Sequence, residues 1–285
     1  MDHNNSKQKP TRRLSPIINE ASSGGEDRQF SMNLARGLEV LRSFTAADPV
    51  LTNRTISERT GLPKATVSRL TYTLTAFGYL RQDDAGAYRL GTAVLSLAHP
   101  VLGGLALRQI ARPVLQELAA STGCTVNLAT QERVHAIYID SVRSDLANPY
   151  LPDVGSVSPL LHSAIGRALV LAHQGTHREQ LLNRIKVADP QAYAAGIEYL
   201  QADELLFRSE GHCRARGPWL ADIDAIATHI PLPSSTEAAA INCTRSNKAV
   251  VKIDLAKLVP QLQAAAKKIS LLHSGQLGGQ LAHGV

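Results

Sequence analysis

The feature that most constrains the fold of this chain is the placing of glycine and proline across residues 53–91. The segment "TISERTG" has the spacing of a capping box and closes on Gly61, a typical helix stop. Pro63 suits the first turn of the next helix, which Gly78 is placed to end. The following "YLRQDDAGAYRLG" predicts two short strands around a turn. Two helices joined by a tight turn and followed by a hairpin predict a winged helix-turn-helix.

Apolar spacing extends this first unit to residues 29–91. The segment "MNLARGLEVLRSF" predicts a helix ahead of the pair, because its apolar residues recur at helical spacing. Two sets of side chains are expected to face the core: Leu34, Leu38, Leu41 and Phe44 on the first helix, and Val67, Leu70, Leu74 and Phe77 on the third. Residues 1–28 are polar and charged, which predicts a disordered tail.

The opposite face of the third helix is unusual because it carries no acidic residue. The positions expected there are Lys64, Ala65, Thr66, Ser68, Arg69 and Tyr72. Side chains of these types can reach phosphates and base edges of DNA, and Arg54, Arg81 and Arg89 can add phosphate contacts from the flanks and the wing. The face therefore predicts an interface for double-stranded DNA. The alternative is a cytosolic small-molecule sensor whose winged helix mediates protein assembly, since acid-free faces also arise by chance.

The composition fits a soluble globular protein of two domains, with 44% hydrophobic and 19% charged residues among 285. The formal net charge of +6 permits a polyanionic partner and does not establish one. The three cysteines lie far apart without a CxxC motif, which argues against a disulfide framework or a zinc site. The chain shows neither a signal peptide nor an unbroken apolar run of spanning length. We therefore expect a cytoplasmic protein without a membrane partner.

A second domain is predicted over residues 113–272, after a linker helix over residues 92–112 that Pro100 and Gly103–Gly104 should bend or interrupt. Strand-like segments occur at 124–130, 134–142, 223–232, 238–244 and 249–255, with helical segments between or after them. This mixture favours an α+β domain with an antiparallel sheet. Residues 273–285 are predicted to be a flexible tail.

Three motifs give residues 30–272 a resemblance to a known family. "GLPKATVSRLTYTLTAFGYL" with "YRLG" behind it is followed by "RPVLQELAASTGCTVNLAT" and then by "PLLHSAIGRALVLA". Their order and spacing resemble those of IclR-family transcriptional regulators. The resemblance implies a GAF-like C-terminal domain that binds a small organic effector, often a carboxylate or an aromatic acid. It also implies a homodimer or homotetramer, joined partly through the DNA-binding domains, that recognises a pseudo-palindromic operator.

The resemblance further implies a set of residues that line the effector pocket. They are His162, Ser163, Ala164 and Gly166 at a helix start, Ala225 in place of a frequent cysteine, and Asn242 and Thr244 in place of strand serines. A helix N-terminus offers free N–H groups to a carboxylate, and Asn242 and Thr244 share a sheet face because they alternate along a strand. The segment "CRARGPW" departs from the family by placing Arg214, Arg216 and Trp219 where an acid is usual. This departure favours a larger effector that is anionic or aromatic.

No catalytic, cofactor or metal site is expected. His162 and Ser163 are neighbours whose side chains would diverge by about 100° on a helix, and the chain has no GxSxG elbow. The ten histidines are scattered along the chain and form no HxH pair, and no metal site is expected among them. The sequence therefore predicts a regulator, and an effector would act by binding one arrangement of its DNA-binding domains better than another.

Overall fold

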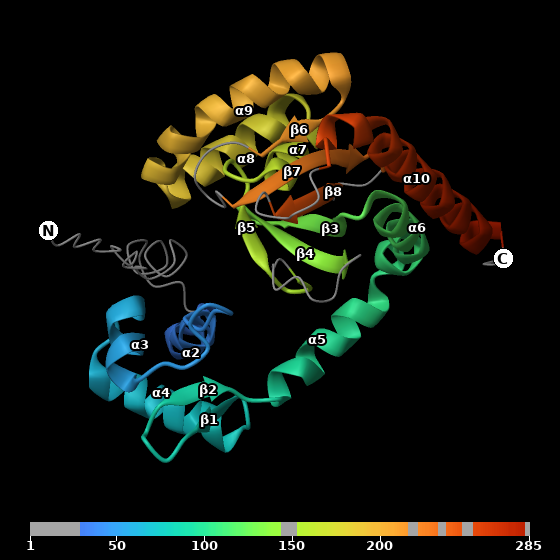
Figure 1. Cartoon of the computed structure of the whole chain (residues 1–285). Coiled ribbons are helices and arrows are strands. Elements are labelled where there is room, and N and C mark those ends of the chain that lie inside the picture. The colour runs from blue at the N-terminus through green and yellow to red at the C-terminus, as the bar shows by residue number, and fades with distance from the viewer. Residues whose placement is uncertain (1–28, 144–152, 216–221, 233–237, 247–252, 283–285) are drawn as a thin grey trace, which may run out of the picture. The chain divides into compact units, whose positions relative to one another are not determined.

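A computed structural model of the chain describes residues 29–143, 153–215, 222–232, 238–246 and 253–282. The chain divides into two compact units, Met1–Val101 and Leu102–Val285, each described by itself (Figure 1). The expected N-terminal tail, residues 1–28, lies outside the described residues.

The described part of the first unit is a helical group with a two-stranded hairpin. Its elements are α2 (Met32–Arg42), α3 (Asn53–Thr60), α4 (Lys64–Ala76), β1 (Leu80–Gln82) and β2 (Tyr88–Leu90). The hydroxyl of Thr52 caps α3 by accepting the N–H of Thr55 at 3.2 Å. Gly61 ends α3 at φ 70°, a left-handed conformation that favours glycine. The predicted helix-turn-helix and wing are confirmed.

The small core of this unit corrects the expected burial of three side chains. Leu34 and Leu38 are 63% and 51% exposed, and Phe77 is 72% exposed. Helix α2 buries Val40 instead, and a Cβ built on Gly37 would lie 4.0 Å from the Leu70 side chain of α4. Phe77 follows the last residue of α4 as its C-cap, so the helical period no longer sets its direction. The buried apolar side chains are Val40, Phe44, Leu51, Ile56, Leu62, Val67, Leu80 and Tyr88.

The second unit is built on a six-stranded antiparallel sheet in the order β5-β4-β3-β8-β7-β6. The strands are β3 (Thr125–Glu132), β4 (His135–Val142), β5 (Val157–Pro159), β6 (Cys213–Arg214), β7 (Ile223–Ile230) and β8 (Ala239–Ser246). The helices are α6 (Ala106–Thr122), α7 (Ala164–Ala172), α8 (Gly175–Ala188), α9 (Pro190–Glu210), the short η1 (Leu255–Leu258) and α10 (Val259–Ala282). The predicted α+β class with an antiparallel sheet is confirmed.

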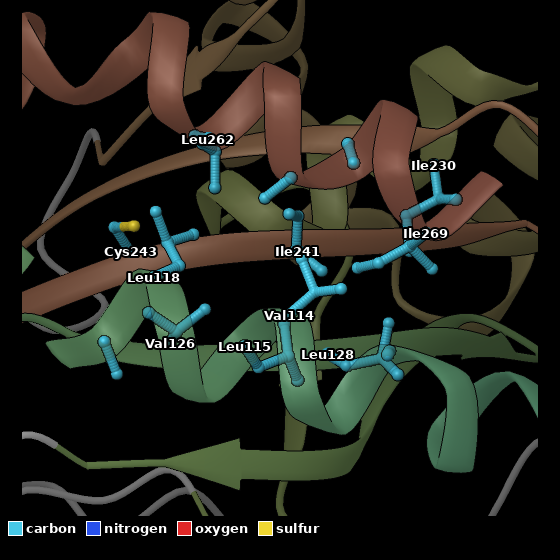
Figure 2. Close-up of a cluster of buried hydrophobic side chains, with 14 of the residues drawn as sticks. Val114, Leu115, Leu118, Val126, Leu128, Ile230, Ile241, Cys243, Leu262 and Ile269 are labelled. Atoms are coloured by element: carbon cyan, nitrogen blue, oxygen red, sulfur yellow. The ribbon is translucent and has the colours of Figure 1, made fainter. Parts of the chain in front are cut away.

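An apolar layer covers each face of this sheet. On one face α6 and α10 pack against β3, β7 and β8, with Val114, Leu128, Ile241, Leu262 and Ile269 at the centre of the contact (Figure 2). On the other face α7 packs against β7 and β8, and α8 and α9 lie beyond it. The middle of the sheet is therefore enclosed, and the side chains of Asn127 and Asn242 on its central strands are buried.

Several element boundaries differ from the sequence expectations. Helix α5 (Ala93–Gly104) contains Pro100, and the chain breaks only at Leu105 before α6, which runs across the expected boundary at 112/113. Helix α10 continues to Ala282, because glycine costs only about 1 kcal/mol in a helix and no proline follows Leu272 to stop it. The last expected strand covers residues 249–255, of which 249–252 lie outside the described residues. The described remainder is not a strand, and its last residue, Leu255, begins η1.

Within the described residues no single helix is long and apolar enough to cross a membrane. Helices α5 and α6 meet that test of length and composition only when they are taken together as a bent pair.

Candidate functional site

The acid-free face of α4 is exposed in the first unit. Helix α4 buries Val67 and Thr71, and the remaining positions are turned outward or sit at the edge. Tyr72 is 78% exposed, Lys64 and Arg69 are exposed, and Thr66 is half-buried. Of the residues predicted for DNA contact, Lys64, Ala65, Ser68, Arg69 and Tyr72 are exposed within about 140° of the helix circumference, and Thr66 lies at the edge of this arc. Donors and an aromatic ring without a carboxylate are suited to a polyanion.

Asn53 is a polar residue of this face that the sequence analysis missed. Its side-chain Nδ2 donates a hydrogen bond to Ser68 Oγ at 2.9 Å. The only signal in the sequence was an amide at the first position of α3, which has the appearance of ordinary helix-start chemistry. The contact adds α3 to the surface that α4 presents.

The flanking arginines have different environments. Arg54 Nε lies 2.7 Å from Glu58 Oε1, and hydrogen bonding to this carboxylate raises the pKa of the guanidinium. Arg81 and Arg89 are directly opposite on β1 and β2, and both are exposed. Like charges opposite each other destabilise a hairpin unless an anion lies between them. The wing therefore carries a paired positive charge, while Arg54 is partly neutralised.

The second unit holds a row of hydrogen-bonded polar side chains across three adjacent strands. Ser141 on β4 lies opposite Asn127 on β3, which lies opposite Asn242 on β8. Ser141 Oγ donates to Asn127 Oδ1 at 2.8 Å, and Asn127 Nδ2 donates to Asn242 Oδ1 at 2.8 Å. Thr244 Oγ1 lies 3.4 Å from the same Nδ2. We call Ser141, Asn127, Asn242 and Thr244 the polar row.

Three more polar groups lie on the α7 side of the sheet. Ser158 Oγ and Ser163 Oγ are 3.1 Å apart, and Ser163 Oγ accepts the N–H of Gly166 at 3.0 Å to cap α7. Burial raises the pKa of Tyr138 to about 12, although its hydrogen bonds with Ser158 and Asn242 oppose the shift. The phenol therefore stays protonated and joins Ser158 to the polar row.

The predicted effector residues are only partly brought together by these contacts. Asn242, Thr244 and Ser163 belong to the connected polar groups, and Ala225 lies opposite Thr244 on β7. Ala164 is buried among apolar side chains. The sequence did not predict four further polar residues of this region, which are Asn127, Tyr138, Ser141 and Ser158. Strand pairing, and not local sequence, makes them neighbours of the predicted residues.

His162 and Gly166 have local roles. His162 Nε2 lies 2.8 Å from the carbonyl of Ala192, so its ring is held by α9. A Cβ on Gly166 would lie 2.5 Å from the Leu160 carbonyl, so glycine is needed for this close approach. Because Ser163 already binds the Gly166 N–H, that group is not available to an effector carboxylate.

The basic segment ahead of β7 is described only in part. Arg214 Nε donates to His212 Nε2 at 3.2 Å. Arg216 and Trp219 lie outside the described residues. In the part of the chain that the structure describes, no group of three or more His, Cys, Asp or Glu side chains is arranged to hold a metal ion.

Known proteins resemble both units. Residues 33–84 match the IclR helix-turn-helix domain, and residues 99–271 match the C-terminal domain of bacterial transcriptional regulators of the IclR type. The Pca regulon regulatory protein of Pseudomonas putida is 30% identical over 253 residues, which cover 85% of this chain and 84% of that protein.

Solved structures agree with these matches. The crystal structure of an IclR family transcriptional regulator from Brucella abortus is 34% identical and superposes with a TM-score of 0.74, over 89% of this chain and 96% of that one. An IclR homologue from Microbacterium hydrocarbonoxydans, complexed with 4-hydroxybenzoate, is 26% identical with a TM-score of 0.61, over 84% of this chain and 98% of that one.

Proposed function

This chain belongs to the IclR family of transcriptional regulators, and we propose that it reads its operator through the exposed face of α4. In helix-turn-helix proteins the second helix of the motif lies in the major groove. The observation that carries the proposal is the acid-free face of α4, where Lys64, Arg69 and Tyr72 project beside the Asn53–Ser68 pair. Arg69 and Lys64 contact guanine or phosphate, and Thr66 and Ser68 contact phosphate or base.

The regulator binds as a homodimer or homotetramer. Two copies of α4 then enter successive major grooves, about 34 Å apart, and read a pseudo-palindromic operator. The alternative use of the winged helix for protein assembly is not favoured, because the named relatives are transcriptional regulators.

Arg69→Ala tests the DNA interface. Fluorescence anisotropy is measured on duplexes from upstream of the protein's own gene, with excess competitor DNA and at two salt concentrations. We expect the variant to weaken specific binding at least about tenfold, which is the usual effect of removing one good base-reading side chain. Arg208→Ala, which removes an exposed helical arginine from the second unit, is the matched control. Equal affinity of Arg69→Ala and wild type for the operator would remove Arg69 from the interface.

The effector is a small organic molecule, anionic or aromatic, that binds beside the polar row. Support comes from the enclosed setting of Asn127, Asn242 and Thr244, whose amides and hydroxyl orient a polar ligand while the apolar layer around α7 suits a ring. The related homologue that was crystallised with 4-hydroxybenzoate makes small aromatic carboxylates the first class to test.

Calorimetry with 4-hydroxybenzoate, benzoate and glycerol tests this class. We expect the carboxylates to bind and to change operator affinity in the anisotropy assay, and glycerol to do neither. A preference for neutral polyols would contradict the proposed effector class and leave the DNA interface unaffected.

A further inference from the structure

Asp140 is a fully buried carboxylate that fastens α6 to the sheet. Its Oδ1 lies 2.6 Å from Arg112 Nη1 and 3.9 Å from Arg108 Nη2, and Arg108 Nε also donates to the carbonyl of Ile139 at 2.9 Å. The two arginines are one turn apart near the start of α6. Buried charge is retained only where such partners compensate it. Asp140 therefore fixes the position of the first turns of α6.

A β-bulge directs this carboxylate toward α6. The pairing of β3 with β4 passes from Leu128↔Asp140 to Ala129↔Tyr138, which leaves Ile139 as the extra residue. Leu128 and Ile139 both lie in the apolar cluster with α6. Asp140 lies on that face as well, where an uninterrupted alternation from Ile139 would have turned it to the other side.

Ser141, the next residue, lies on the opposite face of the sheet. It belongs to the polar row, through its hydrogen bond to Asn127 at 2.8 Å. Its backbone N–H also donates to Asp140 Oδ1 at 2.9 Å, the same oxygen that Arg112 binds. Two consecutive residues of β4 thus contact opposite sides of the sheet: Ser141 binds the polar row and Asp140 binds α6. They are linked because Asp140 Oδ1 accepts hydrogen bonds from both the Ser141 N–H and Arg112.

We propose that Ser141 and Asp140 form a through-sheet link that couples the polar row to the start of α6. A change in the hydrogen bonding of Ser141 shifts its N–H and alters how Asp140 holds Arg112. Helix α6 follows α5 after the single residue Leu105, so its first turns lie close in sequence to the DNA-binding unit. The regulatory meaning of the link rests on the proposed function, while its existence does not.

Backbone hydrogen exchange of residues 109–112 tests the link without an effector. The proteins compared are wild type, Arg112→Met, Ser141→Ala and the double variant. Arg112 is a suitable target because its side chain is 46% exposed, and Arg108 remains beside Asp140. Glu117→Gln is the matched control, since it removes another ion pair of α6, which Glu117 forms with Lys268 of α10 at 2.7 Å.

We expect Arg112→Met to accelerate exchange at residues 109–112 by about fivefold, the equivalent of one hydrogen bond. Ser141→Ala should accelerate it by at least about threefold although Ser141 lies on the face of the sheet opposite to α6, and the double variant should resemble the larger single effect. Glu117→Gln should leave these amides unchanged. If Ser141→Ala does not fold, Ser141→Cys replaces it, because the thiol is close in size and a weak donor.

The proposal is overturned if the folded Ser141 variant exchanges like wild type at residues 109–112, or if the two effects multiply independently. In that case Asp140 is only a structural anchor for α6. Operator binding by the same proteins is measured separately, so that a regulator which fails to bind DNA refutes the proposed function and leaves the exchange result standing.

Discussion

Asn53 donates a hydrogen bond from its side-chain amide to the hydroxyl of Ser68 at 2.9 Å, which ties the first residue of α3 to the exposed face of α4. The bond fixes the rotamer of a hydroxyl that lies among the proposed DNA-contacting residues. Positioned polar groups lose less conformational entropy on binding than free ones. We therefore expect Asn53 and Ser68 to act as one unit of the proposed interface.

Asn53→Ala should weaken specific DNA binding by about three- to tenfold, because it releases Ser68 and removes a donor from the surface. If Asn53 acts through Ser68, Ser68→Ala should have a similar effect and the double variant should lose little more. Anisotropy titrations of the three variants on one operator duplex measure this coupling. Additive losses would show that the two residues contact DNA independently.

Replacing Arg81 or Arg89 of the wing by alanine should weaken DNA binding without lowering the thermal stability of the protein. Removing Arg81 or Arg89 relieves a repulsion between directly opposite like charges, so the melting temperature should stay the same or rise slightly. DNA binding should weaken for all sequences alike, and the slope of log affinity against log salt should fall by about 1 for each phosphate that the protein no longer neutralises. An unchanged slope in Arg89→Ala would exclude the wing from the phosphate interface.

The helix-turn-helix could be predicted because its determinants are local. Gly61 has the left-handed conformation of a helix end, as expected, whereas Pro63 precedes the first turn of α4 as its N-cap and does not lie within that turn. The apolar period placed Val67 in the core correctly, but it failed for Leu34 and Leu38. Periodicity identifies an apolar face, whereas the neighbours available decide how much of it is covered.

The polar row could be predicted only in part because its contacts are distant in sequence. The hydrogen bond between Asn127 and Asn242 spans 115 residues, and the register of β3 with β8 brings the two side chains together. The resemblance to a family supplied Asn242 and Thr244 but gave no signal for Asn127. The role of Asp140 could not be predicted for a further reason. The side chain points toward α6 because of a β-bulge, and no sequence pattern indicates that bulge.

The buried pair Arg167–Asp203 should be the most sensitive ionic contact of the second unit. Arg167 Nε lies 2.7 Å from Asp203 Oδ2, and both side chains are fully buried. Asp203→Ala leaves the guanidinium uncompensated, which should cost about 3–5 kcal/mol of unfolding free energy. Urea denaturation at neutral pH measures this loss.

Glu204→Gln is the control for that measurement, because Glu204 lies next to Asp203 on α9 and is more exposed. It pairs with Arg178 of α8 and with Arg208 of α9. Its loss should be below about 1 kcal/mol. The double replacement Arg167→Met with Asp203→Leu should recover most of the stability, since two apolar groups can replace a buried pair. Equal losses for Asp203→Ala and Glu204→Gln would show that burial does not set the energy of these pairs.

Asn242→Ala should separate ligand response from DNA binding. It takes the acceptor from Asn127 Nδ2 at 2.8 Å, so a destabilisation of about 1–3 kcal/mol is expected. Operator affinity without effector should stay within about twofold, because the change lies in the second unit, whereas the effect of 4-hydroxybenzoate on that affinity should fall about tenfold.

Thr228→Ala is the matched control. It removes a partly buried hydrogen bond from Thr228 to the Gly211 carbonyl, and the position of Thr228 opposite Ile241 puts it on the α10 face of the same sheet. Because both variants lose hydrogen bonds of the same sheet, only a specific role of the polar row predicts that Asn242→Ala blunts the response while Thr228→Ala preserves it.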